Sequence, residues 1–417
     1  MVYAHKPFGA IRAEVVEMEE KPRLEVLTTP SNYDGVRPQV ENVIVKNRDS
    51  FNFKMTELPH MEVAIETLKL GTADLLAMSI EQWKTMDVEG LKISAFLPRR
   101  EPTWVLVSDD KPEYLPYGAK VVCEVELIKR QLLRMRKDLS VYCFEDIIAL
   151  ESLDYSVKNG STEENLEILE HLRSNNLIDG YVISRGKFRQ IKSRVRRHTL
   201  GMQRENPEQE FERFSFIPPP LGGFTVLVSR NGFPTAMINN LNDTAAQLCY
   251  EVENSIYESL SNELKQISGL FVEQKKLSTI LKQYTKLIDN SYSLKTGEFY
   301  LIPSFYGAGL TRGKRKPRAS LKQKQELRTI WNPSREIPAG PRICIYFEVL
   351  GKNSNVSLEM VRIEQILENK FDRGKNVFIT EIKFLVDLLQ QEHEELKRVI
   401  SGLPDEYNAA KPGLLKL

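Results

Sequence analysis

The first 230 residues alternate short apolar runs with stretches of helical periodicity, and this alternation restricts the fold more than any other feature of the chain. Apolar residues at helical spacing, as in PHMEVAIETLKL before Gly71, predict helices between the runs. The runs themselves predict strands at 23–28, 41–46, 73–79, 91–98, 103–108, 119–125, 139–143, 178–184 and 224–229. Strands that alternate with helices indicate layered α/β sheets, and their number here indicates two such sheets.

The remainder of the chain has a different pattern. The turn-rich IPPPLGG (217–223) predicts a stiff crossing between two lobes, and apolar spacing predicts a long helix at 243–266. After a Pro-containing linker (332–342), we expect a small α/β unit. Its predicted elements are a strand at 342–350, a helix at 358–371, a strand at 376–380 and a final helix at 381–400.

Composition excludes several classes of protein. The formal net charge is +1, so no bulk positive field points to nucleic acid. No apolar run reaches the roughly 18 residues that span a bilayer, and the start of the chain lacks the pattern of a secretory signal, so we expect a cytoplasmic protein. The four cysteines and five histidines form no cluster, so we expect neither a disulfide framework nor a metal site.

Two basic stretches, 185–198 and 312–328, are predicted to be solvated faces. RNA, an acidic protein or a polyanionic porphyrin-like ligand are the alternatives for them. Phe188 is the one aromatic residue of the first stretch, which is too few for a base-stacking platform, so we do not expect nucleic-acid binding.

Three segments, in order along the chain, resemble the hydroxymethylbilane synthase (porphobilinogen deaminase) family. They are ADLLAMSIEQ (73–82), LKISAFLPRREPTWVLVS (91–108) and LPYGAKVVCEVELIKRQLLRMRKDL (115–139). The middle segment keeps Leu97, Pro98, Arg99 and Pro102 of the family motif, and the third keeps Lys129-Arg130-Gln131. IDGYVIS and PPPLGGFTVLVSR extend the resemblance, which covers roughly residues 22 to 310.

The resemblance implies a transferase of tetrapyrrole and haem (porphyrin) biosynthesis. Such enzymes polymerise four porphobilinogen units on a dipyrromethane cofactor that a cysteine anchors. It also implies two lobes like those of periplasmic binding proteins, with a smaller third domain. We therefore expect lobe 1 at 1–107 with 218–240, lobe 2 at 108–217, a small α+β third domain at 241–330, and an α/β extension at 331–417.

The position of the family's catalytic aspartate holds Gln82, and Glu81 is adjacent. An amide cannot relay a proton at neutral pH or supply a carboxylate's charge to a cationic pyrrolic intermediate. Glu81 could take this role only from one position away, where its side chain points in a different direction. The catalytic group of this chain is therefore unknown from sequence.

The cofactor-attachment position is also changed. Glu253 matches the helix that precedes the family's attachment loop, but that loop holds Leu270 and Phe271 in place of a thiol. The nearest cysteine, Cys249, is within the helix, more than a helical turn away from the loop. We expect no bound cofactor.

The resemblance places the substrate carboxylates near Thr28, Ser31, Ser79, Lys129 and Arg130. Of the family's paired arginines only Arg130 remains, and a lysine cannot reproduce a bidentate guanidinium clamp. Carboxylates also stand where the family has hydroxyl groups and an arginine, at Glu124 or Glu126 and at Glu145-Asp146. These carboxylates oppose an anionic ligand.

These departures predict a catalytically degenerate homologue, a pseudoenzyme. Two alternatives stay open: an active deaminase with a rearranged site, and a non-catalytic small-anion binding or scaffold protein. The ligand would be porphobilinogen or another pyrrolic carboxylate, and the extension could hold a protein partner. Because the linker separates the extension from the ligand cleft, we expect residues 1–310 to fold without it.

Overall fold

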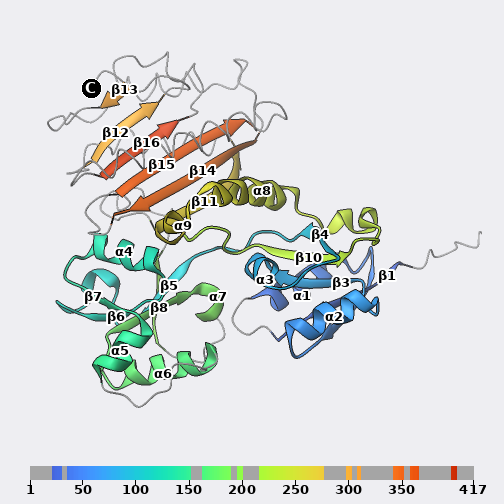
Figure 1. The fold of residues 1–417 in the computed structure, drawn as a ribbon, viewed down its shortest axis with the longest axis horizontal. Coiled ribbons are helices and arrows are strands. Elements are labelled where there is room, and N and C mark those ends of the chain that lie inside the picture. Colours follow the sequence, from blue (N-terminus) through green and yellow to red (C-terminus); the bar gives the residue numbers. More distant parts are fainter. Residues whose placement is uncertain are drawn as a thin grey trace, which may run out of the picture.

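The computed structural model describes residues 21–30, 35–151, 162–188, 195–200, 216–276, 297–302, 308–310, 341–351, 357–365 and 396–401. These residues form three β-sheets with helices on their faces. In Figure 1 two lobes lie side by side, and the third sheet lies above the left-hand lobe and the junction between the two. No helix in these ranges is long and apolar enough to cross a membrane.

Lobe 1 is a five-stranded sheet in the order β2-β1-β3-β10-β4. Its strands are β1 (Arg23–Thr28), β2 (Asn52–Glu57), β3 (Leu75–Ser79), β4 (Leu91–Phe96) and β10 (Thr225–Arg230). Its helices are α1 (Val36–Asn47), α2 (Met61–Leu70) and α3 (Ile80–Thr85). Strand β10 returns from far along the chain and runs antiparallel between β3 and β4. Because β-strand side chains alternate between faces, β1 buries Val26 against α1 and Leu27 in the core on the side of α2.

Lobe 2 repeats this plan with the order β7-β6-β8-β5-β9. Its strands are β5 (Trp104–Ser108), β6 (Lys120–Val122), β7 (Ser140–Tyr142), β8 (Gly180–Ser184) and β9 (Arg197–Leu200). Its helices are η1 (Pro112–Tyr114), α4 (Glu126–Met135), α5 (Phe144–Leu150), α6 (Thr162–Ser174) and α7 (Arg185–Phe188). Strand β5 runs antiparallel to both β8 and β9, as β10 does in lobe 1. The chain leaves lobe 1 after β4 and returns through β10, which confirms the predicted pair of periplasmic-binding-protein-like lobes.

The third sheet has six strands in the order β11-β14-β15-β16-β12-β13. They are β11 (Ser268–Lys276), β12 (Gly297–Ile302), β13 (Ala308–Leu310), β14 (Pro341–Leu350), β15 (Ser357–Gln365) and β16 (Leu396–Ser401). Between lobe 1 and this sheet the chain forms η3 (Thr235–Leu241), α8 (Thr244–Ser259) and α9 (Asn262–Ile267).

This sheet corrects the expected division at residue 331. Strand β11 comes from the predicted third domain and β14 from the predicted extension. The two strands nevertheless pair over nine residues, and Ser268 lies opposite Val349 at one end and Lys276 opposite Pro341 at the other. Strand β12 likewise pairs with β16. The two predicted units therefore share one sheet, because backbone pairing joins segments that the linker separates in sequence.

Three predicted elements differ from those observed. Residues 41–46 belong to helix α1, because Val36, Val40 and Ile44 share its lobe-facing side at helical spacing. Residues 357–365 form strand β15 instead of a helix, since pairing with β14 overrides their local preference. Residues 396–401 form β16 instead of a helix end. The predicted strand 376–380 and most of the final helix lie outside the described residues.

Lobe 2 also contains a loop that one arginine holds in place. The Arg136 guanidinium donates to the backbone carbonyls of Leu115 and Pro116, at 2.7 and 3.2 Å, and pairs with Asp138. The hydrogen bond from Arg136 lowers the pKa of Asp138 from its ordinary 3.8 to about 2. Within the same loop Tyr117 stays 92% exposed.

We expect this pair to make stability depend on pH in the acid range. A carboxyl group whose pKa is lower in the folded state stabilises fully above its ordinary pKa, and the contribution is lost as pH falls towards the folded value. Asp138→Asn should therefore lower the melting temperature most at pH 5–7, and the difference from the parent should shrink between pH 4 and pH 2. A difference that stays constant down to pH 2 would contradict this assignment.

Candidate functional site

The residues that the sequence places at the ligand site lie at the carboxyl ends of strands in the two lobes. Thr28 ends β1 and Ser79 ends β3 in lobe 1, and Lys129 and Arg130 follow β6 on helix α4 in lobe 2. This is the edge at which α/β sheets bind ligands. Ser31 lies outside the described residues.

Ser79 and Gln82 are engaged with each other. The Gln82 backbone N–H donates to Ser79 Oγ at 3.2 Å, and the Ser79 N–H donates to Gln82 Oε1 at 2.9 Å. This reciprocal pair is a capping box, which satisfies free backbone groups at the start of α3. The amide that stands where the family has its aspartate therefore has a structural role in this chain.

Glu81 lies in the first turn of α3 and is exposed. A carboxylate there interacts favourably with the positive end of the helix dipole. Its neighbour Gln82 is half-buried and faces the cap. The two side chains therefore occupy different environments on α3, and the structure does not bring Glu81 into the position of Gln82.

Thr28 is fully buried, and its Oγ1 has no hydrogen-bond partner. Strand alternation puts this side chain on the α1 face of the sheet, together with Leu24 and Val26. Thr225, opposite Ser79 on β10, likewise has a buried Oγ1 without a partner. Buried hydroxyl groups without partners are rare, and they call for a structural or ligand-related explanation.

The N-terminus of α1 stands at the same edge. Its N-cap is Gly35 at φ +74°, with no side-chain cap and no acidic residue in the first turn. The Arg100 guanidinium lies beside it, since Nη1 would be 2.6 Å from a Cβ atom on Gly35. The N-terminus of a twelve-residue helix, without an acidic side chain in its first turn and next to a guanidinium, forms a favourable environment for an anion.

Lobe 2 presents the opposite charge at its edge. Glu124 accepts a hydrogen bond from the backbone N–H of Phe144 at 2.5 Å, so its carboxylate occupies the N-terminus of α5. Acidic side chains also stand in the first turns of α4 (Glu126) and α5 (Glu145 and Asp146). Glu124 therefore takes the place of an anionic ligand at the start of α5, and the negative charges of the other carboxylates oppose an anion at this edge.

Arg130 is engaged with its own chain. Its Nε donates to Glu126 at 2.7 Å, and its Nη1 donates to the backbone carbonyl of Leu350, at the end of β14, at 2.8 Å. Lys129, its neighbour on α4, is half-buried. The guanidinium that the sequence assigns to substrate therefore joins lobe 2 to the third sheet.

The cofactor-attachment position lies within strand β11. Leu270 is fully buried and pairs with Phe347, and Phe271 stacks on Tyr346 with ring centroids 6.2 Å apart. Cys249 is buried in α8, and burial raises the pKa of its thiol to about 12. A thiol with this pKa is almost entirely protonated at neutral pH and is a poor nucleophile.

Arg99 and Glu253, two residues that match the family's motifs, form a buried ion pair. Two guanidinium nitrogens of Arg99 contact the two carboxylate oxygens of Glu253 at 2.8 and 3.0 Å. The guanidinium also lies over the rings of Phe224 and Phe271, at 4.0 and 4.7 Å from their centroids. Burial raises the pKa of Glu253, and Arg99 opposes this shift. No spacing rule predicts this pair, because 154 residues separate its members.

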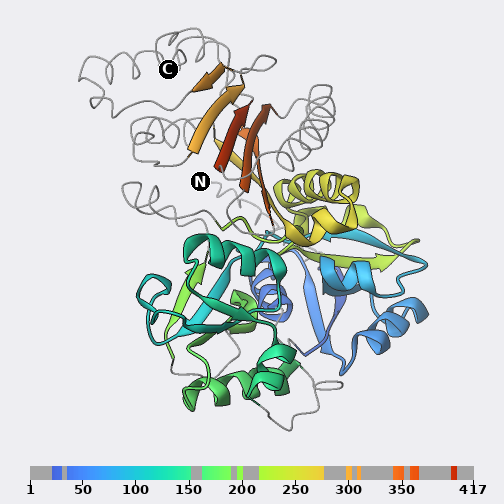
Figure 2. The same ribbon diagram turned by 60° about the vertical axis from the view of Figure 1, so that its left-hand side comes forward.

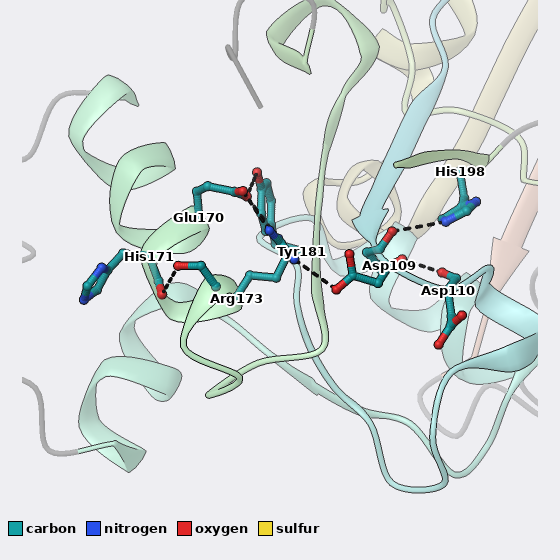
Figure 3. Close-up of polar contacts among 9 residues, drawn as sticks. Asp109, Asp110, Glu170, His171, Arg173, Tyr181 and His198 are labelled. Carbon is teal, nitrogen blue, oxygen red and sulfur yellow. Dashed lines mark hydrogen bonds and ion pairs between the residues drawn. The ribbon is translucent and has the colours of Figure 1, made fainter. Parts of the chain in front are cut away.

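A second polar cluster lies at the other end of lobe 2, near the start of β8 (Figure 3). The Tyr181 hydroxyl donates to Glu170 at 3.0 Å, and Arg173 bridges Glu170 and Asp109.

The basic stretch that begins at residue 185 contributes to lobe 2. Its Phe188 is buried beneath Arg197, whose guanidinium lies 5.1 Å from the ring centroid. Phe188 therefore cannot stack on a nucleic-acid base.

Comparison with known proteins gives only distant likenesses. No protein-family model matches the chain, and no curated protein matches it in sequence. It is similar to a cysteine-to-serine mutant of the OxyR2 regulatory domain from Vibrio vulnificus, at 11% identity and a TM-score of 0.29, over 55% of this chain and 96% of that one. It is also similar to the reduced OxyR regulatory domain from Pseudomonas aeruginosa, at 14% identity and a TM-score of 0.27, over 55% and 98% of the two chains. A double mutant of the VFT2 domain of BvgS from Bordetella pertussis is similar at 14% identity and a TM-score of 0.29, over 56% of this chain and 91% of that one.

Because these identities and TM-scores are low, we describe the architecture from the strand order of this chain. In each lobe three neighbouring strands of the sheet are parallel, and the fourth strand, β10 in lobe 1 and β5 in lobe 2, runs antiparallel between them and the last strand. The protein is a mixed α/β chain with two periplasmic-binding-protein-like lobes, and a third sheet packs on both of them.

Proposed function

We propose that this protein is a catalytically degenerate relative of hydroxymethylbilane synthase, which binds a small anion between its lobes without polymerising porphobilinogen. The capping box carries this proposal, because it gives Gln82 a structural role at the position of the family's aspartate. A proton-handling group must reach the reacting atoms in the correct ionisation state, and an amide cannot do so.

The surroundings of the attachment position support the same proposal. Leu270 lies in a paired strand with its side chain in the core, and the Cys249 thiol is buried among apolar residues of α8 and β11. Neither offers an exposed thiolate that could hold a dipyrromethane. We expect the intact mass of the purified protein to equal that of the unmodified chain, and an adduct of two pyrrole units on any cysteine would contradict the proposal.

Binding is supported by lobe 1. The N-terminus of α1, the Arg100 guanidinium and the buried Thr28 hydroxyl lie at the same edge of its sheet. A carboxylate or phosphate group is the ligand chemistry that these groups recognise. Porphobilinogen, which carries two carboxylates, is the first ligand to test because of the sequence resemblance.

Calorimetric titration with porphobilinogen, and separately with inorganic phosphate, tests the binding. We expect one of these probes to bind, with no linear tetrapyrrole formed. Thr28→Val should weaken binding by roughly 10-fold or more, since a hydrogen bond to a charged group contributes about 1.5–3 kcal/mol. The ligand-free melting temperature should not fall, because the hydroxyl has no partner to lose.

Thr67→Val is the matched control, because Thr67 donates to the Val63 carbonyl on the exposed face of α2. It should leave affinity unchanged. Absence of binding by both probes would contradict the binding function, whereas turnover of porphobilinogen would show an active deaminase with a rearranged site.

Restoring the carboxylate alone should not restore the reaction. We expect Gln82→Asp to show no deaminase activity, because a thiol for the cofactor and the arginine clamps are also missing. Ser79 remains the N-cap of α3, and a carboxylate in the first turn interacts favourably with the helix dipole, so the variant should fold. Substantial activity in this single variant would mean that the rest of the site is intact.

A further inference from the structure

The third sheet shares a core with lobe 1. Leu270 and Val272 of β11, together with Ile345 and Phe347 of β14, belong to the same buried cluster as Met78 and Phe224 of lobe 1. Helix α8 completes this cluster through residues such as Val252 and Ile256. The sheet and lobe 1 are therefore one packed body.

The same sheet is joined to lobe 2 through buried polar groups. Gln131 Nε2 donates to Glu348 Oε1 at 2.7 Å, and Arg134 Nη1 donates to Glu348 Oε2 at 2.7 Å. Glu348 and Gln131 are completely buried, and Arg134 is 6% exposed. Figures 1 and 2 both place α4, which carries Gln131 and Arg134, directly against the end of the sheet where β14 finishes.

The returning crossing between the lobes lies inside this junction. Gln131 Nε2 also donates to the Ile217 carbonyl at 2.9 Å, and the Leu270 N–H donates to the Pro218 carbonyl at 3.0 Å. At Gly269 the third sheet lies so close to this crossing that a Cβ atom on residue 269 would be 2.5 Å from the backbone oxygen of Ile217. The segment about which lobe 2 would turn is thus held by α4 on one side and by β11 on the other.

Two-lobe proteins of this architecture open and close by rotation at such crossings. Here, rotation of lobe 2 away from the sheet separates α4 from β14 and removes Gln131 and Arg134 from the buried Glu348 carboxylate. Separating a buried ion pair is strongly unfavourable, so the contact between Arg134 and Glu348 resists the movement. We propose that Glu348, with Gln131 and Arg134, is a latch that holds lobe 2 in one orientation relative to lobe 1 and must open before the lobes can move.

The latch can be tested by measuring distances between spin labels in the full-length chain. Leu70 on lobe 1 is 81% exposed and Tyr117 on lobe 2 is 92% exposed, so Leu70→Cys and Tyr117→Cys provide the labelling sites. Cys143, the half-buried native cysteine, is replaced by serine, which can also cap α5. The other three cysteines are buried. With the latch intact, we expect a single narrow distance distribution.

Glu348→Gln and Arg134→Met each remove the charge pairing of the latch. Each should broaden the distribution or add a second distance population. Each should also speed amide hydrogen exchange in residues 97–103 and 216–224. Tyr181→Phe is the control, since it removes a buried hydrogen bond within lobe 2 without touching the sheet. It should leave the distances unchanged.

The proposal fails if folded Glu348→Gln and Arg134→Met proteins keep the single parental distance and the parental exchange rates. If neither variant folds, Gln131→Met decides the question, because it removes one neutral donor and leaves the charged pair in place. It should then broaden the distribution to a smaller extent, and an unchanged distribution would overturn the latch.

Discussion

A chain that ends at Pro338 should fail to form a cooperatively folded, monomeric protein. This truncation removes β14, which leaves all nine residues of β11 without their antiparallel partner. It removes Ile345 and Phe347 from the buried cluster that they share with α8 and lobe 1, and it takes Glu348 away from Arg134. An exposed, long and apolar strand edge promotes aggregation. The shared sheet therefore predicts the opposite of the sequence-based expectation that residues 1–310 fold alone.

A point variant measures the same effect without removing backbone. Phe347 is completely buried in the core shared by β14 and lobe 1, so Phe347→Ala should cost about 3–5 kcal/mol of unfolding free energy in denaturant titration. Tyr117→Ala, at a 92% exposed position, should change it by no more than about 0.5 kcal/mol. A truncated protein that melts as cooperatively as the full chain would show that the third sheet is dispensable.

Arg99→Met should be comparably destabilising, for an electrostatic reason. The substitution leaves the Glu253 carboxylate fully buried with only the backbone N–H groups of Leu221 and Val272 as partners. Breaking a buried ion pair from one side typically costs about 3–5 kcal/mol. Denaturant unfolding of the variant measures this cost directly.

Two further variants separate the ion pair from loss of packing. Arg185→Met breaks an exposed pair with Glu101 and should cost less than about 1 kcal/mol. The double variant Arg99→Met with Glu253→Leu removes both charges and should recover part of the loss, although two backbone donors then lack an acceptor. A loss below about 1 kcal/mol in Arg99→Met alone would mean that the pair contributes no more than a surface contact.

The proposed latch and the proposed ligand site depend on different contacts. The ligand site uses lobe 1 groups near Thr28 and α1, whereas the latch joins α4 to β14. If ligand binding closes the lobes, loss of the latch should raise affinity, because less work is needed to move lobe 2. If binding needs no movement, Glu348→Gln should bind with parental affinity.

The amino-acid sequence by itself determined the local elements and the plan of the two lobes. Strands β1 and β10 follow from the apolar runs at 23–28 and 224–229, and the end of α2 follows from Gly71, which takes the left-handed conformation that glycine tolerates. These are short-range properties, because they depend on the residues within a few positions of each site. Thr28 and Ser79, which the family resemblance assigned to the ligand site, lie at the carboxyl ends of β1 and β3.

Only the tertiary structure decided what the polar residues contact. Arg99 meets Glu253 across 154 positions, and Arg134 meets Glu348 across 214. The motifs assign Arg130 to the substrate and Gln82 to catalysis. In the structure Arg130 donates to the Leu350 carbonyl, and Gln82 accepts from the Ser79 N–H. Residues 357–365 became a strand because β14 offered a complementary edge, although their local pattern suggested a helix. Periodicity records which face of an element is apolar, but it holds no information on which distant segment will cover that face or satisfy its charges.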